Sequence, residues 1–186
     1  MSLNKDFFLT LIGQGGVGKS SLCGVFLKDR FSTSYNPTEE EFYRQTIKIQ
    51  NKIVNLFISD VKASGDSLSE TILKSQGLMF VYDISNKESY DEVCKLYRKI
   101  IDSKSCEFIT KILIGNKCDL VDNREVSFEI GMRTAAEWGC KFIEVSAKNN
   151  DKVILAFTEC AFAFIKSAEE NTETRSSFCE RACCIL

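Results

Sequence analysis

A glycine-rich segment near the N-terminus constrains this chain more than any other feature. Gly13–Ser20 has the sequence GQGGVGKS, which matches the pattern G-x-x-x-x-G-K-[ST]. It lies between the apolar run Phe7–Ile12, which predicts a strand, and Lys19–Leu27, which predicts a helix. Glycines let successive backbone N–H groups converge on phosphate oxygens, and the helix directs the positive end of its dipole at the same anion. The sequence therefore predicts a phosphate-binding loop.

Two side chains of this loop carry the expected chemistry. Lys19 is expected to reach the β- and γ-phosphates of a nucleotide, and the Ser20 hydroxyl is expected to ligate Mg²⁺. The alternative, a glycine-rich turn without a ligand, is disfavoured because the complete motif stands between a strand and a helix. The loop alone does not separate ATP from GTP.

After the loop, short apolar runs alternate with helix-length amphipathic segments. Further strands are expected at Phe42–Ile49, Ile53–Ile58, Leu78–Ile84, Ile112–Ile114 and Phe142–Val145, the first two as a hairpin. Further helices are expected at Glu88–Asp102, Phe128–Trp138 and Lys152–Ser167. This order predicts an α/β fold, with a mostly parallel sheet, helices on both faces and one antiparallel edge strand. A length of 186 residues fits one domain.

Two further segments indicate which base is bound. Asn116–Asp119 (NKCD) follows an expected strand, and ligands of open α/β sheets bind at that end of a strand. The Asp119 carboxylate can accept from the N1–H and 2-amino groups of guanine, a donor pair that adenine lacks. Asn116 would tie this segment to the phosphate loop, and the stem of Lys117 would cover one face of the base. Ser146–Lys148 (SAK), after the last strand, would offer backbone N–H to the guanine O6. Each segment alone also fits an ordinary polar loop, but their order favours guanine.

These three segments resemble the Ras-type small GTPases, over about residues 6–168 and the extreme C-terminus. The resemblance implies a P-loop NTPase of the Ras-like fold, with a six-stranded mixed sheet flanked by five helices, and GTP or GDP with Mg²⁺ as ligands. The nucleotide contacts that it implies are Gly15, Gly16, Val17, Gly18, Lys19, Ser20, Ser21, Phe31, Tyr35, Thr38, Ala63, Asn116, Lys117, Asp119, Ser146, Ala147 and Lys148. The metal ligands that it implies are Ser20, Thr38 and Asp60.

The first switch of that family has a counterpart at residues 31–43, including its Tyr-x-Pro-Thr core. By this match Thr38 supplies a second hydroxyl to Mg²⁺, and its backbone N–H contacts the γ-phosphate. Phe31 would cover the guanine edge-on, and Tyr35 would close over the phosphates. Loss of the γ-phosphate would remove the Thr38 contact and release the loop.

The end of the first switch is the expected partner surface. In the Ras subfamily, the stretch Glu39–Tyr43 corresponds to the surface that receives effector domains by strand addition and complementary charge. A solvated loop explains the acidic residues equally well. Glu41 and Phe42 stand where close relatives carry Asp-Ser, so the effector is not identified by the match.

The second switch departs from the family pattern Asp-x-x-Gly followed by glutamine. Asp60 matches the aspartate, which holds Mg²⁺ through water, but Ala63 replaces the glycine and Ser64 replaces the glutamine. Glycine adopts φ angles that Ala63 resists, and Ser64 is too short to position the attacking water as glutamine does. Gly65 as a displaced hinge is the less favoured alternative. Lys19 and Ser64 are thus the candidate catalytic positions, and we expect GTP hydrolysis that is slow or negligible.

The C-terminal residues match a lipidation signal. Apolar periodicity stops near Glu169, so residues 1–168 are predicted as the GTPase domain and residues 169–186 as a flexible tail. The tail ends in a C-a-a-X box whose Cys183 is the expected geranylgeranyl site. It is not polybasic, so palmitoylation of Cys179 is the expected second signal, with prenylation of Cys184 as the alternative. We expect the chain on the cytoplasmic face of a cell membrane, plasma membrane or endomembrane.

Composition excludes other classes. A net charge of −2 argues against nucleic-acid binding, and the absence of histidine argues against a zinc site. An ATP-dependent kinase or transferase is disfavoured by Asn116, Asp119 and the lack of a substrate domain.

The resemblance implies exchange factors and GTPase-activating proteins as partners of a monomer, and the small size of Gly15 and Gly16 leaves room for a partner's arginine. The remaining alternative is a GTP/GDP-binding signalling module with negligible intrinsic hydrolysis.

Overall fold

The computed structural model describes residues 5–28, 41–60, 66–102 and 109–182. Its strands are β1 (Lys5–Ile12), β2 (Glu41–Ile49), β3 (Lys52–Asp60), β4 (Gly77–Asp83), β5 (Thr110–Asn116) and β6 (Lys141–Glu144). Its helices are α1 (Lys19–Lys28), α2 (Asp66–Lys74), α3 (Lys87–Asp102), α4 (Phe128–Glu137), α5 (Asn150–Ala182) and the short 3₁₀ helix η1 (Val121–Asn123). This confirms the predicted α/β class.

The described strands form one six-stranded mixed sheet in the order β2-β3-β1-β4-β5-β6. All neighbours pair in parallel except β2 and β3, which form the predicted antiparallel hairpin at the sheet edge. Gln50 has a φ of 53° and lies in the turn of this hairpin. The central strand β4 is buried along its whole length, as its continuous apolar sequence predicts for a strand covered on both faces.

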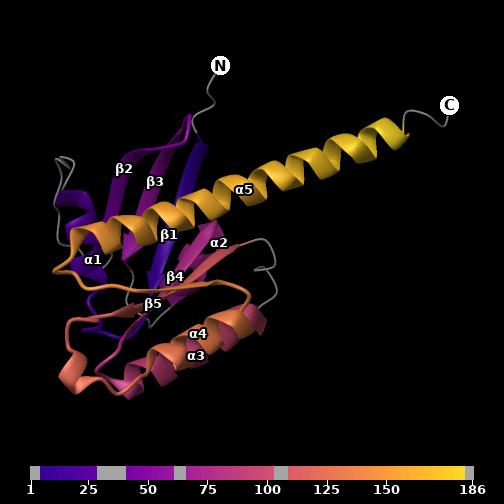
Figure 1. Ribbon diagram of the computed structural model, residues 1–186. Coiled ribbons are helices and arrows are strands. Elements are labelled where there is room, and N and C mark those ends of the chain that lie inside the picture. The colour runs from indigo at the N-terminus through magenta and orange to yellow at the C-terminus, as the bar shows by residue number, and fades with distance from the viewer. Residues whose placement is uncertain (1–4, 29–40, 61–65, 103–108, 183–186) are drawn as a thin grey trace.

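Helices cover the two faces of the sheet and enclose two hydrophobic clusters (Figure 1). On one face α1 and α5 pack on the sheet, with Phe26 of α1 stacked on Phe157 of α5 at 4.2 Å between ring centroids. On the other face α2, α3 and α4 contribute buried side chains to the second cluster. The carboxyl ends of the parallel strands remain free for a site.

Helix α2 was not among the ranges expected from apolar periodicity. Of its described side chains only Ile72 is a buried hydrophobic residue, so the helical repeat is too short to see in the sequence. Its carboxyl end is fixed to β1 instead by a buried hydrogen bond of 2.6 Å between Thr10 and Ser75. Ser75 also donates to the Thr71 carbonyl at 2.7 Å.

Helix α5 continues to Ala182, and its carboxyl half projects beyond the sheet (Figure 1). The helix therefore extends past its expected end at Ser167, whereas the division into a GTPase domain and a flexible tail stays a prediction. No proline or glycine follows Gly139 to end the helix. An i,i+4 ion pair joins Lys166 to Glu170 at 3.9 Å, and Lys52 of the hairpin pairs with Glu169. Among the helices described, none combines the length and hydropathy that crossing a bilayer requires.

Candidate nucleotide-binding site

The predicted site residues gather at one edge of the sheet. The phosphate loop follows β1, Asp60 ends β3, Asn116 ends β5, and Ser146 follows β6. These strands run parallel, so their carboxyl ends meet at the same edge, where ligands of such sheets bind.

The phosphate loop adopts a conformation that requires glycine. Gly16 and Gly18 have φ angles of +83° and +95°. A Cβ on Gly13 would lie 2.1 Å from the Val81 carbonyl oxygen, and one on Gly18 would lie 2.5 Å from Asn116 Nδ2. The first helical hydrogen bond runs from Leu22 N–H to the Gly18 carbonyl at 3.0 Å. The earlier N–H groups of α1 therefore point at the loop and are available to an anion.

Lys19 lies across this loop. Its Nζ donates to the Gly13 carbonyl at 2.9 Å and to the Gln14 carbonyl at 3.3 Å, and the residue is buried. Burial lowers the pKa of Lys19, while the nearby Asp60 carboxylate acts in the opposite direction. The loop thus holds a desolvated ammonium group at the position predicted to contact the β- and γ-phosphates.

Ser20 and Asp60 form the predicted metal-binding pair. The Ser20 hydroxyl, at the start of α1, donates to Asp60 Oδ2, at the end of β3. Hydroxyl and carboxylate oxygens are hard ligands that suit Mg²⁺, which also keeps several waters and phosphate oxygens. No cluster of three or more His, Cys, Asp or Glu side chains suited to a metal occurs in the described parts of the chain. The Ser20 and Asp60 oxygens themselves fit Mg²⁺ held jointly by protein and nucleotide.

Asn116 joins the base-recognition segment to the phosphate loop, as predicted. Its Nδ2 donates to the Val17 carbonyl at 2.7 Å, and the residue is 1% exposed. Its Oδ1 is buried and accepts no hydrogen bond within the described residues. A buried acceptor without a partner is costly, so this oxygen offers a contact to a bound ligand or water.

Lys117 crosses the same loop with a φ of 61°. Its Nζ donates to the Gly16 carbonyl at 3.0 Å and pairs with Asp83 Oδ2 at 2.6 Å. Burial raises the pKa of Asp83, but hydrogen bonds from Lys117 and Ser85 outweigh this effect and leave the pKa below its ordinary value. Asp83 therefore holds Lys117 in position beside the loop.

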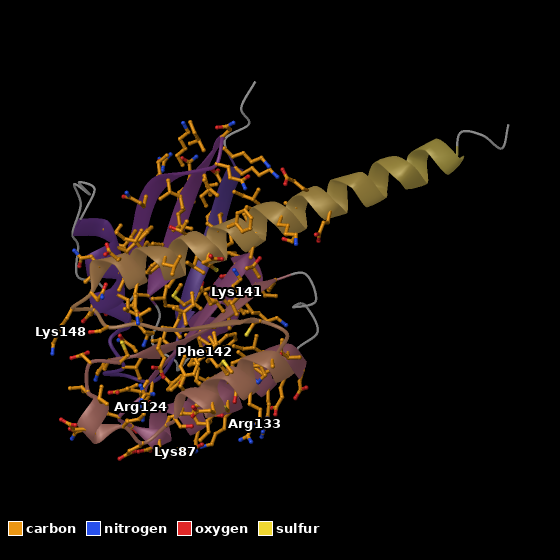
Figure 2. The ribbon with its side chains drawn as sticks, in the orientation of Figure 1. Lys87, Arg124, Arg133, Lys141, Phe142 and Lys148 are labelled. Carbon is orange, nitrogen blue, oxygen red and sulfur yellow. The ribbon has the colours of Figure 1, made fainter. Side chains whose placement is uncertain are left out.

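Asp119 forms side-chain hydrogen bonds with two residues of the Ser146–Lys148 segment. Its carboxylate accepts from Ser146 Oγ and from Lys148 Nζ, both at 2.6 Å. These contacts, with Lys148 first, lower the pKa of Asp119 and keep it ionised. The Lys148 side chain projects outward (Figure 2) and is 79% exposed, so it can leave the carboxylate when a base binds there. The half-buried Ala147 lies between these two residues in the chain.

Comparison with known proteins identifies the group to which this chain belongs. The model of the Ras family matches residues 9–166, which is most of the chain. The chain belongs to the Ras family. It is also similar to Ras-like protein 2 of Mucor circinelloides f. lusitanicus, at 30% identity over 188 aligned residues that cover 98% of this chain and 95% of the relative.

As a Ras-family small GTPase, the protein binds GTP and GDP with Mg²⁺, and the residues above take up distinct tasks. In that complex Lys19 and the N–H groups of α1 would surround phosphate, Ser20 and Asp60 would hold the ion, and Asp119 with Ser146 would select the base. When bound, Mg²⁺ neutralises charge on the β- and γ-phosphate oxygens. These groups are therefore expected to position the nucleotide and to discriminate guanine from adenine.

Several predicted site residues of this Ras-family GTPase lie outside the described residues, so their roles stay predictions. They are Phe31, Tyr35, Thr38, Ala63, Ser64 and Cys183. Cys179 belongs to helix α5. Glu39 and Glu40 are also outside, whereas Phe42 and Tyr43 belong to β2.

Two functional contacts were missed from the sequence. Asp83 ends β4 directly opposite Asn116 of β5, so its place at a strand end was the available signal. The Ser146 side chain, predicted to contribute only its backbone, also donates to Asp119 and accepts from the Lys148 N–H at 3.1 Å. A serine after a strand has no distinctive pattern, so this role needed the structure.

Proposed function

We propose that this GTPase is a guanine-nucleotide-dependent switch in membrane-associated signalling, and that it hydrolyses GTP slowly. One contrast supports the proposal. The contact between Ser20 and Asp60 keeps the metal-binding pair together, whereas the sequence that follows Asp60 lacks the family's glycine and glutamine at Ala63 and Ser64. The predicted Mg²⁺ ligands Ser20 and Asp60 are thus retained, whereas the glutamine that would position the attacking water is replaced by Ser64.

The chemical consequence falls on the attacking water. In phosphoryl transfer, catalysis is almost entirely positioning plus electrostatic stabilisation. Lys19 and the loop N–H groups still stabilise charge on the γ-phosphate, but the Ser64 hydroxyl has too short a reach to orient a water behind it. The protein is therefore expected to bind GTP with high affinity and to hydrolyse it slowly.

A second candidate function follows from the same sequence. If hydrolysis is negligible without a partner, the protein is a GTP/GDP-binding signalling module whose active state ends by nucleotide exchange or removal of the protein. The replacement of glutamine by Ser64 favours this version. A Cβ on Gly15 would meet no atom of the described residues within 4 Å, which leaves space for a catalytic arginine from a partner.

We also propose that lipid on Cys183, with palmitate on Cys179, holds the protein on the cytoplasmic face of a membrane. The C-a-a-X sequence supports the first lipid. Helix α5 supports the arrangement, because it carries the residues before the box away from the nucleotide site (Figure 1). One prenyl chain alone anchors weakly, which is why a second signal is needed.

The test of the switch is single-turnover hydrolysis of preloaded GTP with Mg²⁺. Wild type is compared with the Ala63→Gly/Ser64→Gln double variant, and each single variant serves as a control. We expect the double variant to hydrolyse roughly ten-fold faster or more, chiefly through Ser64→Gln. Equal rates for wild type and the double variant would refute the proposed cause of slow hydrolysis. Failure of wild type to retain guanine nucleotide would refute the assignment of the site.

A further inference from the structure

The segment between η1 and α4 is fixed to several elements around the nucleotide site. It consists of residues 124–126, none of which is among the predicted nucleotide contacts. We call these three residues the clamp. Val126 is fully buried in the second hydrophobic cluster, whereas Arg124 is partly buried and Glu125 is exposed. Val126 therefore anchors the clamp in the core, and the two charged side chains remain free to contact neighbouring elements.

Arg124 joins the clamp to β6. Its guanidinium donates two hydrogen bonds to the Glu144 carboxylate, at 2.6 and 2.8 Å, and a third to the Val126 carbonyl at 3.0 Å. Glu144 is the last residue of β6, and its side chain is only 10% exposed. A bidentate pair fixes orientation as well as distance. Because Ser146 lies two residues after Glu144, this pair fixes the start of the segment that contacts Asp119.

Glu125 joins the clamp to α3. Its Oε2 accepts from the backbone N–H of Lys87, the first residue of α3, at 2.7 Å, and Figure 2 shows Lys87 near Arg124. The first N–H groups of a helix have no partner within the helix, and a carboxylate there is also favoured by the helix dipole. The backbone N–H groups of Glu125 and Val126 donate to the Ile84 carbonyl, directly after β4, at 2.9 and 3.0 Å. The clamp is thus bonded to β4 and α3 as well as to β6.

Tight turns connect the clamp to Asp119. Three backbone hydrogen bonds, each between residues three apart, cover the intervening segment: Leu120 to Lys117 at 2.9 Å, Asn123 to Leu120 at 3.1 Å and Arg124 to Val121 at 3.3 Å. Asp119 lies inside the first of these turns. Because the turns follow one another without a gap, a displacement of the clamp also displaces Asp119.

The clamp closes a ring around the predicted base contacts. One side of the ring is the segment 119–124, and the other is the segment 144–146. The Arg124–Glu144 pair joins them at one end, and the hydrogen bond of 2.6 Å from Ser146 to Asp119 joins them at the other. Two parallel hydrogen bonds to guanine require the Asp119 carboxylate to lie in line with both donors. The orientation of that carboxylate therefore depends on the far end of the ring.

We propose that Arg124 and Glu125 are positioning residues for guanine recognition, which hold Asp119 and Ser146 in the geometry that the base requires. Groups held in position before binding lose little freedom when the ligand arrives, and this increases affinity. The inference concerns the base contacts of this Ras-family chain. It depends neither on the rate of hydrolysis nor on the membrane anchoring proposed above.

Inosine diphosphate separates positioning from stability. Its base keeps the N1–H of guanine but lacks the 2-amino group, so it can make one of the two hydrogen bonds predicted for Asp119. A firmly held carboxylate gains affinity from the second bond, and a loosely held one gains less. Loss of the clamp is therefore expected to weaken GDP binding more than inosine diphosphate binding. A purely structural defect would weaken both by the same factor.

The test measures the dissociation constants of GDP and inosine diphosphate for the full chain with Mg²⁺, by competition with a fluorescent GDP analogue. Glu125→Ala removes the bond to α3, and Arg124→Lys keeps the charge but loses the bidentate geometry. A hydrogen bond to a charged group contributes roughly ten- to hundred-fold in affinity. We expect each variant to reduce the preference for GDP over inosine diphosphate by a part of this, roughly three-fold or more.

Two further variants control for charge and for helix stability. Glu125→Gln keeps an oxygen that accepts from the Lys87 N–H, so it is expected to retain the preference of wild type. Glu88→Ala removes the same charge from the first turn of α3 and is expected to leave the preference unchanged. Circular dichroism of the GDP-loaded proteins checks that every variant folds. If Arg124→Lys does not fold, Glu125→Ala decides the question, because Glu125 is exposed.

Three results would overturn the proposal. The first is that Glu125→Ala and Arg124→Lys weaken GDP and inosine diphosphate equally or not at all. The second is that Glu88→Ala changes the preference as much as Glu125→Ala does. The third is that wild type binds both nucleotides with the same affinity, because Asp119 would then make no contact with the 2-amino group for the clamp to position.

Discussion

The Gly18→Ala variant tests whether the phosphate loop and the base-recognition segment depend on one close contact. A Cβ at residue 18 would lie 2.5 Å from Asn116 Nδ2, well inside van der Waals contact. Gly18 also has a φ of +95°, which side chains other than hydrogen rarely allow. The Asn116 amide cannot yield freely, because it is buried and donates to the Val17 carbonyl at 2.7 Å.

The magnitude follows from two terms. Backbone strain from a Cβ in the left-handed region costs about 1–2 kcal/mol. Displacing the Asn116 amide leaves a buried donor without its acceptor, which costs about 1–3 kcal/mol. Both costs arise in the loop that surrounds the phosphates, so we expect the free energy of nucleotide binding to become less favourable by roughly 2–5 kcal/mol. This corresponds to a decrease in GDP affinity of roughly 30-fold to several thousand-fold.

The assay measures association and dissociation of a fluorescent GDP analogue in the presence of Mg²⁺. Gly15→Ala is the matched control, because a Cβ there meets no atom of the part of the chain that the structure describes within 4 Å, and the residue is not in the left-handed region. Denaturant unfolding without nucleotide checks that both variants fold. Equal GDP affinities for the two variants would refute the reasoning, since only Gly18→Ala introduces both the contact with Asn116 and a Cβ at a positive φ.

Three other perturbations test the surrounding structure. Arg124 (labelled in Figure 2) donates hydrogen bonds of 2.6 and 2.8 Å to Glu144 and is largely shielded from solvent. Arg124→Met is therefore expected to cost about 2–3 kcal/mol of stability and to lower the Tm by roughly 5–10 °C in calorimetry. Lys148→Ala is expected to raise the pKa of Asp119 toward its ordinary value in a carboxyl NMR titration. The depressed pKa means that the pair's contribution is present above the ordinary aspartate pKa and lost as pH falls through the lowered one. Cys183→Ser is expected to move the protein from the membrane to the soluble fraction, while an equal effect of Cys184→Ser would show that both cysteines carry lipid.

Local motifs predicted most of the nucleotide site. The phosphate loop, Asn116, Asp119 and Ser146 each follow a strand whose apolar run is visible in the sequence, and parallel strands bring those ends together. Their separation along the chain is therefore no obstacle to prediction. Asp83 was missed because one acidic residue after an apolar run has no distinctive spacing.

Features that depend on packing between elements were not predictable in the same way. Among the described side chains of α2, Ile72 is the buried apolar one, and the Thr10–Ser75 bond fixes the end of the helix; neither feature produces periodicity. The helical course of residues 169–182 was missed because a segment can lose its apolar periodicity without losing its helical backbone. Charged and polar residues continue a helix when neither glycine nor proline ends it.

The nucleotide site and a groove beside α2, lined in part by Phe8, Phe57 and Ser59, share the end of β3. Ser59 and Asp60 are consecutive, so their side chains face opposite sides of the sheet. Asp60 contacts Ser20 in the nucleotide site, whereas Ser59 lines the groove together with Phe57. A shift of register by one residue would exchange these faces, so both sites require the same pairing of β3 with β1. The strand that presents the predicted metal ligand Asp60 therefore also lines the groove.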